Sequence, residues 1–284
     1  MSSRRGAVAV IVATASLILG VNVFAQQTTL SPEQIATIVA SPDRRPADRT
    51  NDLRRKPEQM LAFIGIHPGI VALDVSAAGG YTTELLARAI GPTGTVYGQN
   101  RPRDPNRQPT PPAAPEGNSN PAIAPAAEPA PRAPPVTLAD RDSNLKSAGV
   151  AAARIVAVSR PFEDPVPPEL AEGKFDLVTL MFNYHDLGHL GVDRAAMNRA
   201  VFRALKPGGH FVIADHSGRP NTGISESGTL HRIEEAFLRQ EVQAAGFKLL
   251  EEGNFLRNPN DPRDKNTPDP PQPKDEFVLK FGKP

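Results

Sequence analysis

Residues 71–81 read Val-Ala-Leu-Asp-Val-Ser-Ala-Ala-Gly-Gly-Tyr, an apolar run that gives way to five small residues and then to an aromatic one. The apolar run is typical of a buried strand, and the residues after Tyr81 are typical of an amphipathic helix. In a doubly wound sheet, the loop between such a strand and helix passes directly beneath a ligand, where large side chains would obstruct it. The stretch from Asp74 to Tyr81 therefore predicts a ligand site at a strand-to-helix corner.

The same alternation of strand and helix continues on both sides of this corner. The expected strands are 71–75, 95–97, 154–158, 175–182 and 210–214, and the expected helices are 57–64, 82–90, 194–205 and 230–245. This order is typical of a parallel sheet with helices on both faces. The last two strands, 247–251 and 276–281, have no helix between them and are expected to pair antiparallel at the sheet edge. The sequence thus predicts an α/β fold with a doubly wound, mostly parallel sheet of seven strands.

Two kinds of ligand loop compete for residues 74–81. A dinucleotide fingerprint needs G-x-G-x-x-G and an acid about 20 residues further on, but only Gly79 and Gly80 are present. The loop of class I S-adenosylmethionine-dependent methyltransferases has an acid followed by small residues two, four and six positions later. Ser76, Ala78 and Gly80 occupy those positions behind Asp74. The nicotinamide-oxidoreductase interpretation is accordingly the weaker one.

The chain resembles the class I methyltransferases over about 57–284, apart from residues 101–136. More narrowly, it resembles the exported bacterial "predicted methyltransferase" family, whose substrate is not generally assigned. Besides 74–81, the resemblance rests on the segments 96–100, 175–179, 183–186, 193–198, 205–209, 215–217, 228–232, 245–247 and 277–281.

The resemblance implies S-adenosylmethionine as the cofactor. It assigns cofactor contacts to Asp74, Ser76, Ala78, Gly79, Gly80, Tyr81 and Asn100. Two usual glycines are replaced by Ser76 and Ala78, and the acid that normally binds both ribose hydroxyls is replaced by Gln99-Asn100. The neutral amide of Asn100 should bind a hydroxyl less strongly than a carboxylate does. Asp74 is expected to contact the ammonium of the cofactor, with a helix-capping acid as the alternative.

The acceptor side is expected after the fourth strand, where residues 183–186 read Asn-Tyr-His-Asp. Methyl transfer from a sulfonium is an in-line displacement, so catalysis is mostly alignment, with a base where the acceptor must lose a proton. His185 is the expected base, Tyr184 a stacking or hydroxyl group, and Asn183 an orienting amide. A hydrogen-bonded loop histidine is the alternative for His185. The segment partly resembles the Asn-Pro-Pro-Tyr loop of amino-group methyltransferases, but both prolines are missing, so that specificity is not transferred.

Further polar residues are expected to line the substrate pocket, namely Asp186, His216 and His231. Together with His185, Asp215 and Glu234 they contain the donors of a 2-His-1-carboxylate metal site, with His231 and Glu234 three residues apart on an expected helix. No short ligand motif enforces such a site, so no metal is predicted. The remaining histidines are expected to be loop or strand-edge residues.

The composition of the chain argues against nucleic-acid binding and thiol chemistry, and it limits the size of the folded domain. The 284 residues carry a net charge of +1, with no excess of positive charge to bind nucleic acid, and contain no cysteine for disulfides or thiolate chemistry. Residues 101–136 are rich in Pro and Ala and predict a disordered insert. Residues 256–274 are also judged poor core material. About 200 residues remain for one domain.

The N-terminus has the pattern of a cleavable secretory signal. Arg4-Arg5 precedes an apolar run over 7–21, and Val23-Phe24-Ala25 suits signal peptidase, so residues 1–25 are predicted to be removed. The run is shorter than the ~20 residues that span a bilayer, so an uncleaved anchor is the weaker alternative. Residues 26–56 are expected to form a helical arm with a charged, solvated helix face over 43–56, and 57–284 the methyltransferase-like domain.

These features predict an exported, periplasmic enzyme, without a stable membrane anchor after cleavage, that methylates a small-molecule acceptor. The competing hypothesis is a catalytically degenerate binding protein of the same fold, motivated by Ser76, Ala78 and the missing ribose acid.

Overall fold

The computed structural model describes residues 28–102, 136–268 and 272–284. The predicted signal and nearly all of the predicted insert lie outside these residues. No helix of the described part has both the length and the apolar character needed to cross a bilayer.

A seven-stranded sheet forms the centre of the molecule, with the strand order β3-β2-β1-β4-β5-β7-β6. Only β7 runs against its neighbours, because it pairs antiparallel with both β5 and β6. The predicted doubly wound sheet with an antiparallel C-terminal pair is therefore confirmed. The strands are β1 Val71–Val75, β2 Thr95–Asn100, β3 Arg154–Ser159, β4 Phe175–Met181, β5 Leu205–His216, β6 Lys248–Gly253 and β7 Glu276–Gly282.

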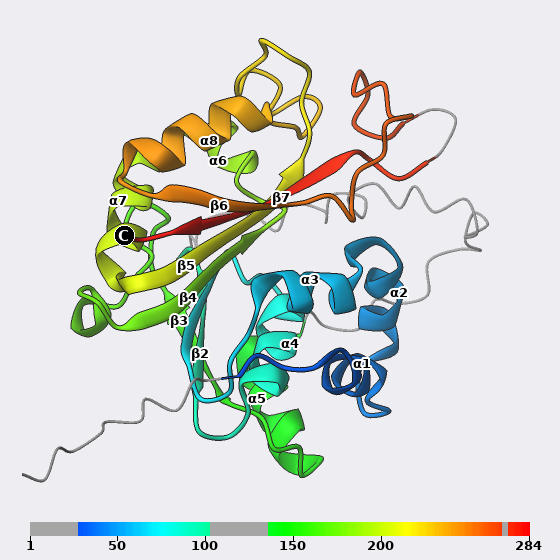
Figure 1. The fold of residues 1–284 in the computed structure, drawn as a ribbon, viewed down its shortest axis with the longest axis vertical. Helices are drawn as coiled ribbons and strands as arrows, with labels where there is room; N and C mark the ends of the chain where they lie inside the picture. Colours follow the sequence, from blue (N-terminus) through cyan, green and yellow to red (C-terminus); the bar gives the residue numbers. More distant parts are fainter. Residues whose placement is uncertain (1–27, 103–135, 269–271) are drawn as a thin grey trace, which may run out of the picture.

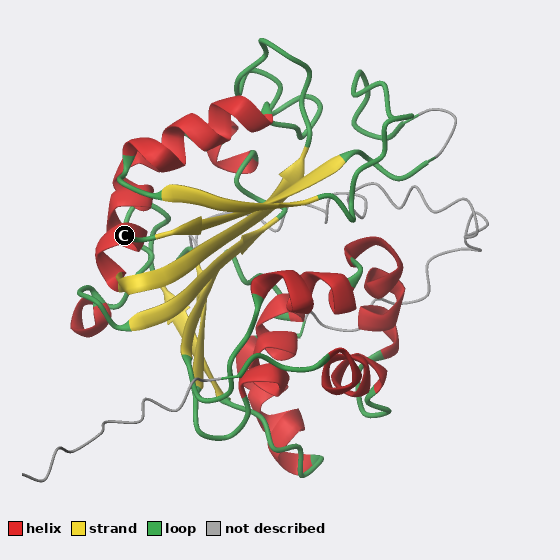
Figure 2. Ribbon diagram, in the orientation of Figure 1, coloured by secondary structure: helices red, strands yellow, loops and turns green. Residues whose placement is uncertain are grey.

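Helices cover both faces of the sheet (Figure 1, Figure 2). One face carries α1 to α5, and the other carries α6, α7 and α8. The helices are α1 Pro32–Ala40, α2 Pro46–Arg55, α3 Pro57–Ile64, α4 Tyr81–Ile90, α5 Leu138–Ser147, α6 Asp186–His189, α7 Arg194–Ala204 and α8 Glu235–Ala244, with a short 3-10 turn at Pro168–Leu170. The sequence prediction omitted α5 and α6.

Each face has its own apolar core. Ile35 and Val39 of α1 pack in the same buried cluster as Leu61 of α3, Ala72 of β1 and Leu86 of α4. The N-terminal helices are thus part of the main body. This arrangement brings the end of α2 close to the beginning of α4.

The predicted helix over 230–245 begins later than expected. α8 starts at Glu235, while Ile233 forms a bridge with Ser217, and His231 has a left-handed φ of 51°. His231 and Glu234 therefore do not share a helix face. The buried guanidinium of Arg232, which pairs with Asp261 at 2.9 Å, holds this stretch in an extended path.

Most described residues of 256–274 are exposed or half-buried, as expected of poor core material, but a few are buried. Leu256, Asp261 and Lys274 are at most 5% exposed. Asp261 binds Arg232 and accepts a hydrogen bond of 2.7 Å from the backbone N–H of Asp275. Ion pairing, which apolar patterning does not detect, anchors this polar segment at Asp261.

Candidate functional site

The loop between β1 and α4 has the geometry of a ligand-binding corner. Ser76, Ala78 and Gly80 all have left-handed backbones, with φ of 59°, 48° and 78°. These are the three alternate positions that the sequence pattern singled out. Glycine adopts this conformation freely, whereas an L-residue incurs roughly 1–2 kcal/mol. The loop backbone thus keeps the path of a glycine-rich loop although two of its residues carry Cβ atoms.

The end of β2 holds this loop in place. Gln99 accepts a hydrogen bond of 3.0 Å from the backbone N–H of Ser76 through its side chain. Asn100 accepts one of 2.8 Å from the N–H of Ala78, and its Nδ2 lies 3.2 Å from the Ala78 carbonyl oxygen. Both amide atoms of Asn100 therefore bind the loop. This differs from the predicted contact with a ribose hydroxyl, because Asn100 is engaged with the protein itself.

A cleft of about 340 Å³ opens beside the loop, at the carboxyl ends of β1 and β4. Its size lies at the lower end of the range of about 300–1,000 Å³ for small-molecule sites. The lining residues come from α2, the loop, α4, α5 and the end of β4: Asp48, Asn51, Arg55, Asp74, Ser76, Ala77, Ala78, Gly79, Tyr81, Thr82, Arg141, Met181, Phe182 and Asn183. Five of the seven predicted cofactor residues line the cleft, while Gly80, at the beginning of α4, and Asn100 do not.

Asp74 is the buried carboxylate of the cleft. It is 2% exposed, and it accepts hydrogen bonds from the hydroxyls of Thr83 (2.6 Å) and Thr179 (2.8 Å). Burial raises the pKa of Asp74 to about 6, and the two hydroxyl groups oppose this rise by stabilising the carboxylate. Because Thr83 lies in the first turn of α4, Asp74 both lines the cleft and supports the helix N-terminus. The position of Asp74 fits both predictions made from the sequence, a contact with the ammonium of the cofactor and an acid at the start of a helix.

The charged stretch around α2 covers the cleft and is not a solvated face. Arg44 is 3% exposed and forms two hydrogen bonds of 2.8 Å with Asp52. Asp52 also accepts the hydroxyl of Tyr81 at 2.6 Å, which connects α2 to the first residue of α4. The interpretation of 43–56 as a solvated face is therefore wrong. Its charges are neutralised within the stretch, as in the Arg44–Asp52 pair, or by residues distant in the sequence, as in the pair of Asp48 with Arg141.

Arg141 of α5 joins the loop to this charged layer. It is 3% exposed, lies 2.7 Å from Asp48 and 2.5 Å from Glu84, and donates a hydrogen bond to the carbonyl oxygen of Gly79. The sequence analysis missed Arg141 because it missed α5. The signal was the pair Thr137 and Asp140, which form a capping box at the start of that helix.

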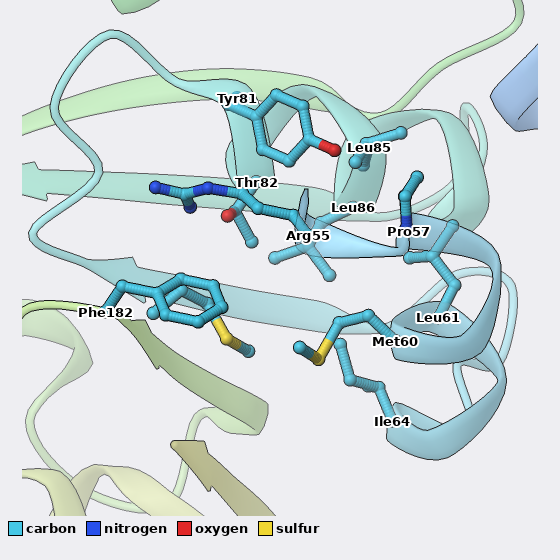
Figure 3. Close-up of a pocket in the computed structure, with 11 residues that line it drawn as sticks. Arg55, Pro57, Met60, Leu61, Ile64, Tyr81, Thr82, Leu85, Leu86 and Phe182 are labelled. Atoms are coloured by element: carbon cyan, nitrogen blue, oxygen red, sulfur yellow. The ribbon is translucent and has the colours of Figure 1, made fainter. Parts of the chain in front are cut away.

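Arg55 extends into the cleft from the last turn of α2. Its guanidinium lies over the rings of Tyr81 and Phe182, at 5.3 Å and 4.7 Å from the ring centroids (Figure 3). Next to it, an apolar recess of about 20 Å³ is formed by α3, α4 and the end of β4. Arg55 therefore lies at the border between a polar cleft and an apolar recess. Sequence reasoning included it only within the charged stretch.

Of the three predicted catalytic residues, only Asn183 lines the cleft. Its Oδ1 accepts a hydrogen bond of 2.6 Å from Ser76 Oγ, and its Nδ2 donates one of 2.7 Å to Asp186. Tyr184 is fully buried, and its hydroxyl contacts Glu241 (3.0 Å) and Asn198 (2.9 Å) on the α7–α8 side of the sheet. The prediction that Tyr184 contacts a substrate does not agree with this position.

His185 is also fully buried and does not line the cleft. Its Nδ1 lies 2.6 Å from Asp215, and its Nε2 lies 3.1 Å from Asp186. Burial alone would lower the pKa of His185, but the two carboxylates outweigh it and raise the pKa to about 10. His185 is therefore held between two carboxylates outside the described cleft, and its role as a general base stays a prediction.

The remaining predicted pocket residues surround His185. His231 Nδ1 lies 2.9 Å from Asp186 Oδ1, and His216, which is 1% exposed, has its Nδ1 2.9 Å from Glu276. Asp186, His185 and His231 thus form one cluster behind Asn183. His216 is part of the packing beneath it, in ring contact with Phe182 and His185. None of the three predicted pocket residues lines the described cleft.

Comparison with known proteins identifies the fold. No family model and no curated protein matches the sequence. A methyltransferase described as S-adenosylmethionine-dependent, from Aquifex aeolicus, superposes with a TM-score of 0.51 at 14% identity, covering 90% of this chain and all of that one.

Two further solved structures superpose over a similar extent. A chain from the complex of the Haloferax volcanii Trm112 methyltransferase activator with a methyltransferase gives a TM-score of 0.51 at 15% identity, covering 90% of this chain and all of that one. The [4+2]-cyclase SpnF gives 0.50 at 12% identity, covering 90% of this chain and 97% of that one. Together with the strand order, these matches show that the chain has the fold of class I S-adenosylmethionine-dependent methyltransferases.

Proposed function

We propose that the chain binds S-adenosylmethionine in the cleft between β1 and β4 and transfers its methyl group to a small-molecule acceptor. The observation that carries this proposal is that a buried carboxylate, Asp74, and a guanidinium, Arg55, line the same cleft. The cleft lies beside a loop whose backbone is left-handed at alternate residues. The amino-acid end of the cofactor carries an ammonium and a carboxylate. Asp74 and Arg55 have the complementary charges.

The reaction needs alignment more than it needs acid or base. Bound S-adenosylmethionine would supply an electrophilic methyl group: the acceptor's lone pair would bond to the methyl carbon as the carbon–sulfur bond breaks, and the bond's electrons would stay on sulfur as a neutral thioether. An acceptor atom that still carries a proton after methylation would release it to water. Asn183, held between Ser76 and Asp186, is the polar group that lies on the acceptor side of the cleft. We assign it the task of orienting the acceptor.

A binding protein of the same fold is the second candidate. It is favoured by the burial of His185, which leaves no imidazole among the residues that line the described cleft. The likeness to a cyclase also shows that this fold supports chemistry other than methyl transfer.

Calorimetry tests which ligand the cleft binds, and turnover then separates the two candidates. Methyl transfer predicts binding of S-adenosylmethionine and of its demethylated product, with no binding of NAD. Arg55→Met should weaken the binding of both cofactor forms by about tenfold or more, because it removes the partner of the carboxylate. Asn51→Ala, also at the cleft but without charge, is the matched control. Mass spectrometry over a panel of acceptors then decides between turnover, which supports the enzyme, and binding alone, which supports the second candidate.

A further inference from the structure

Three imidazole nitrogens surround one carboxylate oxygen next to the cleft. His231 Nδ1 lies 2.9 Å, His185 Nε2 3.1 Å and His189 Nδ1 3.7 Å from Asp186 Oδ1. The other oxygen of Asp186 accepts the hydrogen bond of Asn183, so Oδ1 alone faces the imidazoles. Atoms of His185, Asp186 and His231 lie within 4.8 Å of one another, the spacing at which they could share a single ion.

His185 points to a ligand more specifically than its neighbours do. The side chain is completely enclosed, and Nε2 makes no hydrogen bond although it lies near Asp186. Asp215 is bound to Nδ1 at 2.6 Å and to the backbone N–H of the same residue at 2.7 Å. This fixes the ring orientation and places the Nδ1 proton towards Asp215, so that Nε2 is directed into the cluster, where a bound metal ion would displace its proton. A carboxylate behind a histidine is the usual outer partner of a metal-ligating imidazole.

We propose that His185 Nε2, Asp186 Oδ1 and His231 Nδ1 bind one divalent transition-metal ion. Two imidazoles and one carboxylate, with the remaining positions open, form a donor set that suits Zn²⁺ or Fe²⁺. His189 is outside this set, because its Nδ1 is within 3.0 Å of Ser227 Oγ.

An ion at this site can be reached from solvent, and hydrogen bonds connect its ligands to the loop of the cleft. The side chains of His231 and Asp186 are 34% and 16% exposed, so the ion enters on their side while His185 forms the buried wall. His231 has a left-handed φ of 51°, and its ring contacts Asp186 through Nδ1. Asp186 in turn holds Asn183, and Asn183 holds Ser76 of the loop. The site stands independently of the proposed methyl transfer, because its ligands are outside the cofactor cleft.

Metal binding by the mature chain tests this site in the absence of cofactor. Zn²⁺ titration by calorimetry should show one equivalent bound, and Co²⁺ should give the visible absorption of a nitrogen-ligated ion. His231→Asn keeps a residue that tolerates the left-handed backbone, and it should weaken both signals by about tenfold or more, the loss that even an outer partner of a ligand causes. Asp186→Asn should do the same.

The controls distinguish this site from non-specific metal binding. His67→Asn alters a histidine on the α3–β1 loop and should bind both ions as the unaltered chain does. Asp215→Asn should weaken binding by about 10–100-fold through loss of the orienting carboxylate. Circular dichroism checks folding, and if Asp186→Asn does not fold, the half-exposed His231→Asn decides alone. Absence of Zn²⁺ and Co²⁺ binding, or equal binding by His231→Asn, overturns the proposal. Loss of cofactor binding with metal binding intact would refute only the proposed function.

Discussion

Ala78 keeps a left-handed backbone that alanine disfavours, and its side chain is exposed. Replacement by glycine removes a strain of roughly 1–2 kcal/mol but adds roughly 0.4–1 kcal/mol of unfolded-chain entropy. We therefore expect Ala78→Gly to raise the free energy of unfolding by up to about 1 kcal/mol in urea denaturation. Ala77→Gly, at a buried neighbour without positive φ, should lower it. Equal destabilisation by both changes would mean that the Ala78 backbone is not strained.

The raised pKa of Asp74 predicts a pH-dependent affinity. Burial moves this pKa from 3.8 to about 6 in the unliganded protein, so the side chain becomes largely neutral below pH 6. An ammonium partner needs the ionised form, and affinity for S-adenosylmethionine should therefore fall as pH decreases from 7.5 to 5. Asp74→Asn should bind about tenfold or more weakly at pH 7.5 and lose this pH dependence. Calorimetry at three pH values measures the affinity and its pH dependence. Unchanged affinity in Asp74→Asn would mean that Asp74 only supports the N-terminus of α4.

The same pKa has the opposite effect on the unliganded fold. A carboxyl whose folded pKa exceeds its unfolded value contributes most stability when protonated, and this contribution is lost as pH rises through about 6. Ligand binding and unliganded stability thus respond to pH in opposite directions at this one residue.

At the scale of elements, α5 holds the loop and the charged layer together through Arg141. Arg141→Met would remove the buried ion-pair partner of Asp48 and one of the two arginines that pair with Glu84, and losing one partner of a buried ion pair typically costs about 3–5 kcal/mol. We expect a loss of this size in urea denaturation. Lys146→Met on the same helix removes an exposed pair with Asp142 and should cost less than about 1 kcal/mol. If both changes lowered the free energy of unfolding by a similarly small amount, the ion pairs of Arg141 would be screened by solvent.

The contrast between α4 and α5 explains which elements the sequence predicts. α4 has apolar residues at helical spacing, and its only misplaced boundary was Tyr81 instead of Thr82. α5 buries only Leu138, Arg141 and Leu145, so its pattern is too polar to detect without its partners. The site follows the same rule. The loop at 76–80 is encoded locally, whereas Arg141, Arg55 and the burial of His185 depend on contacts with residues far along the chain.

At the scale of the whole molecule, residues 103–135 remain a prediction from composition. They contain little that could bury apolar surface. Replacing them with a short Gly/Ser linker should leave the melting temperature nearly unchanged, measured beside the unaltered chain. A large drop would mean that this segment packs on the described body.

Export is likewise predicted from residues 1–25 alone. Fractionation should find a periplasmic chain that begins at Gln26, and N-terminal sequencing identifies this end. Arg4→Lys with Arg5→Lys should leave export intact, because the general secretory route requires only positive charge before the apolar run. Full-length protein confined to the cytosol would contradict export. Export abolished by the double change would indicate the twin-arginine route, which carries folded and therefore ligand-loaded protein.

The loop beneath the cleft is held from both sides of residues 103–135. Asn100, just before them, binds Ala78, and Arg141, just after them, binds the carbonyl of Gly79. β2 pairs with β3, and α5 packs against β3 and α4, so contacts outside residues 103–135 hold both Asn100 and Arg141 in place. New chain ends opened here would leave the loop in place, so this is the natural point for circular permutation. A reporter domain spliced into it would lie beside the ligand and register its arrival.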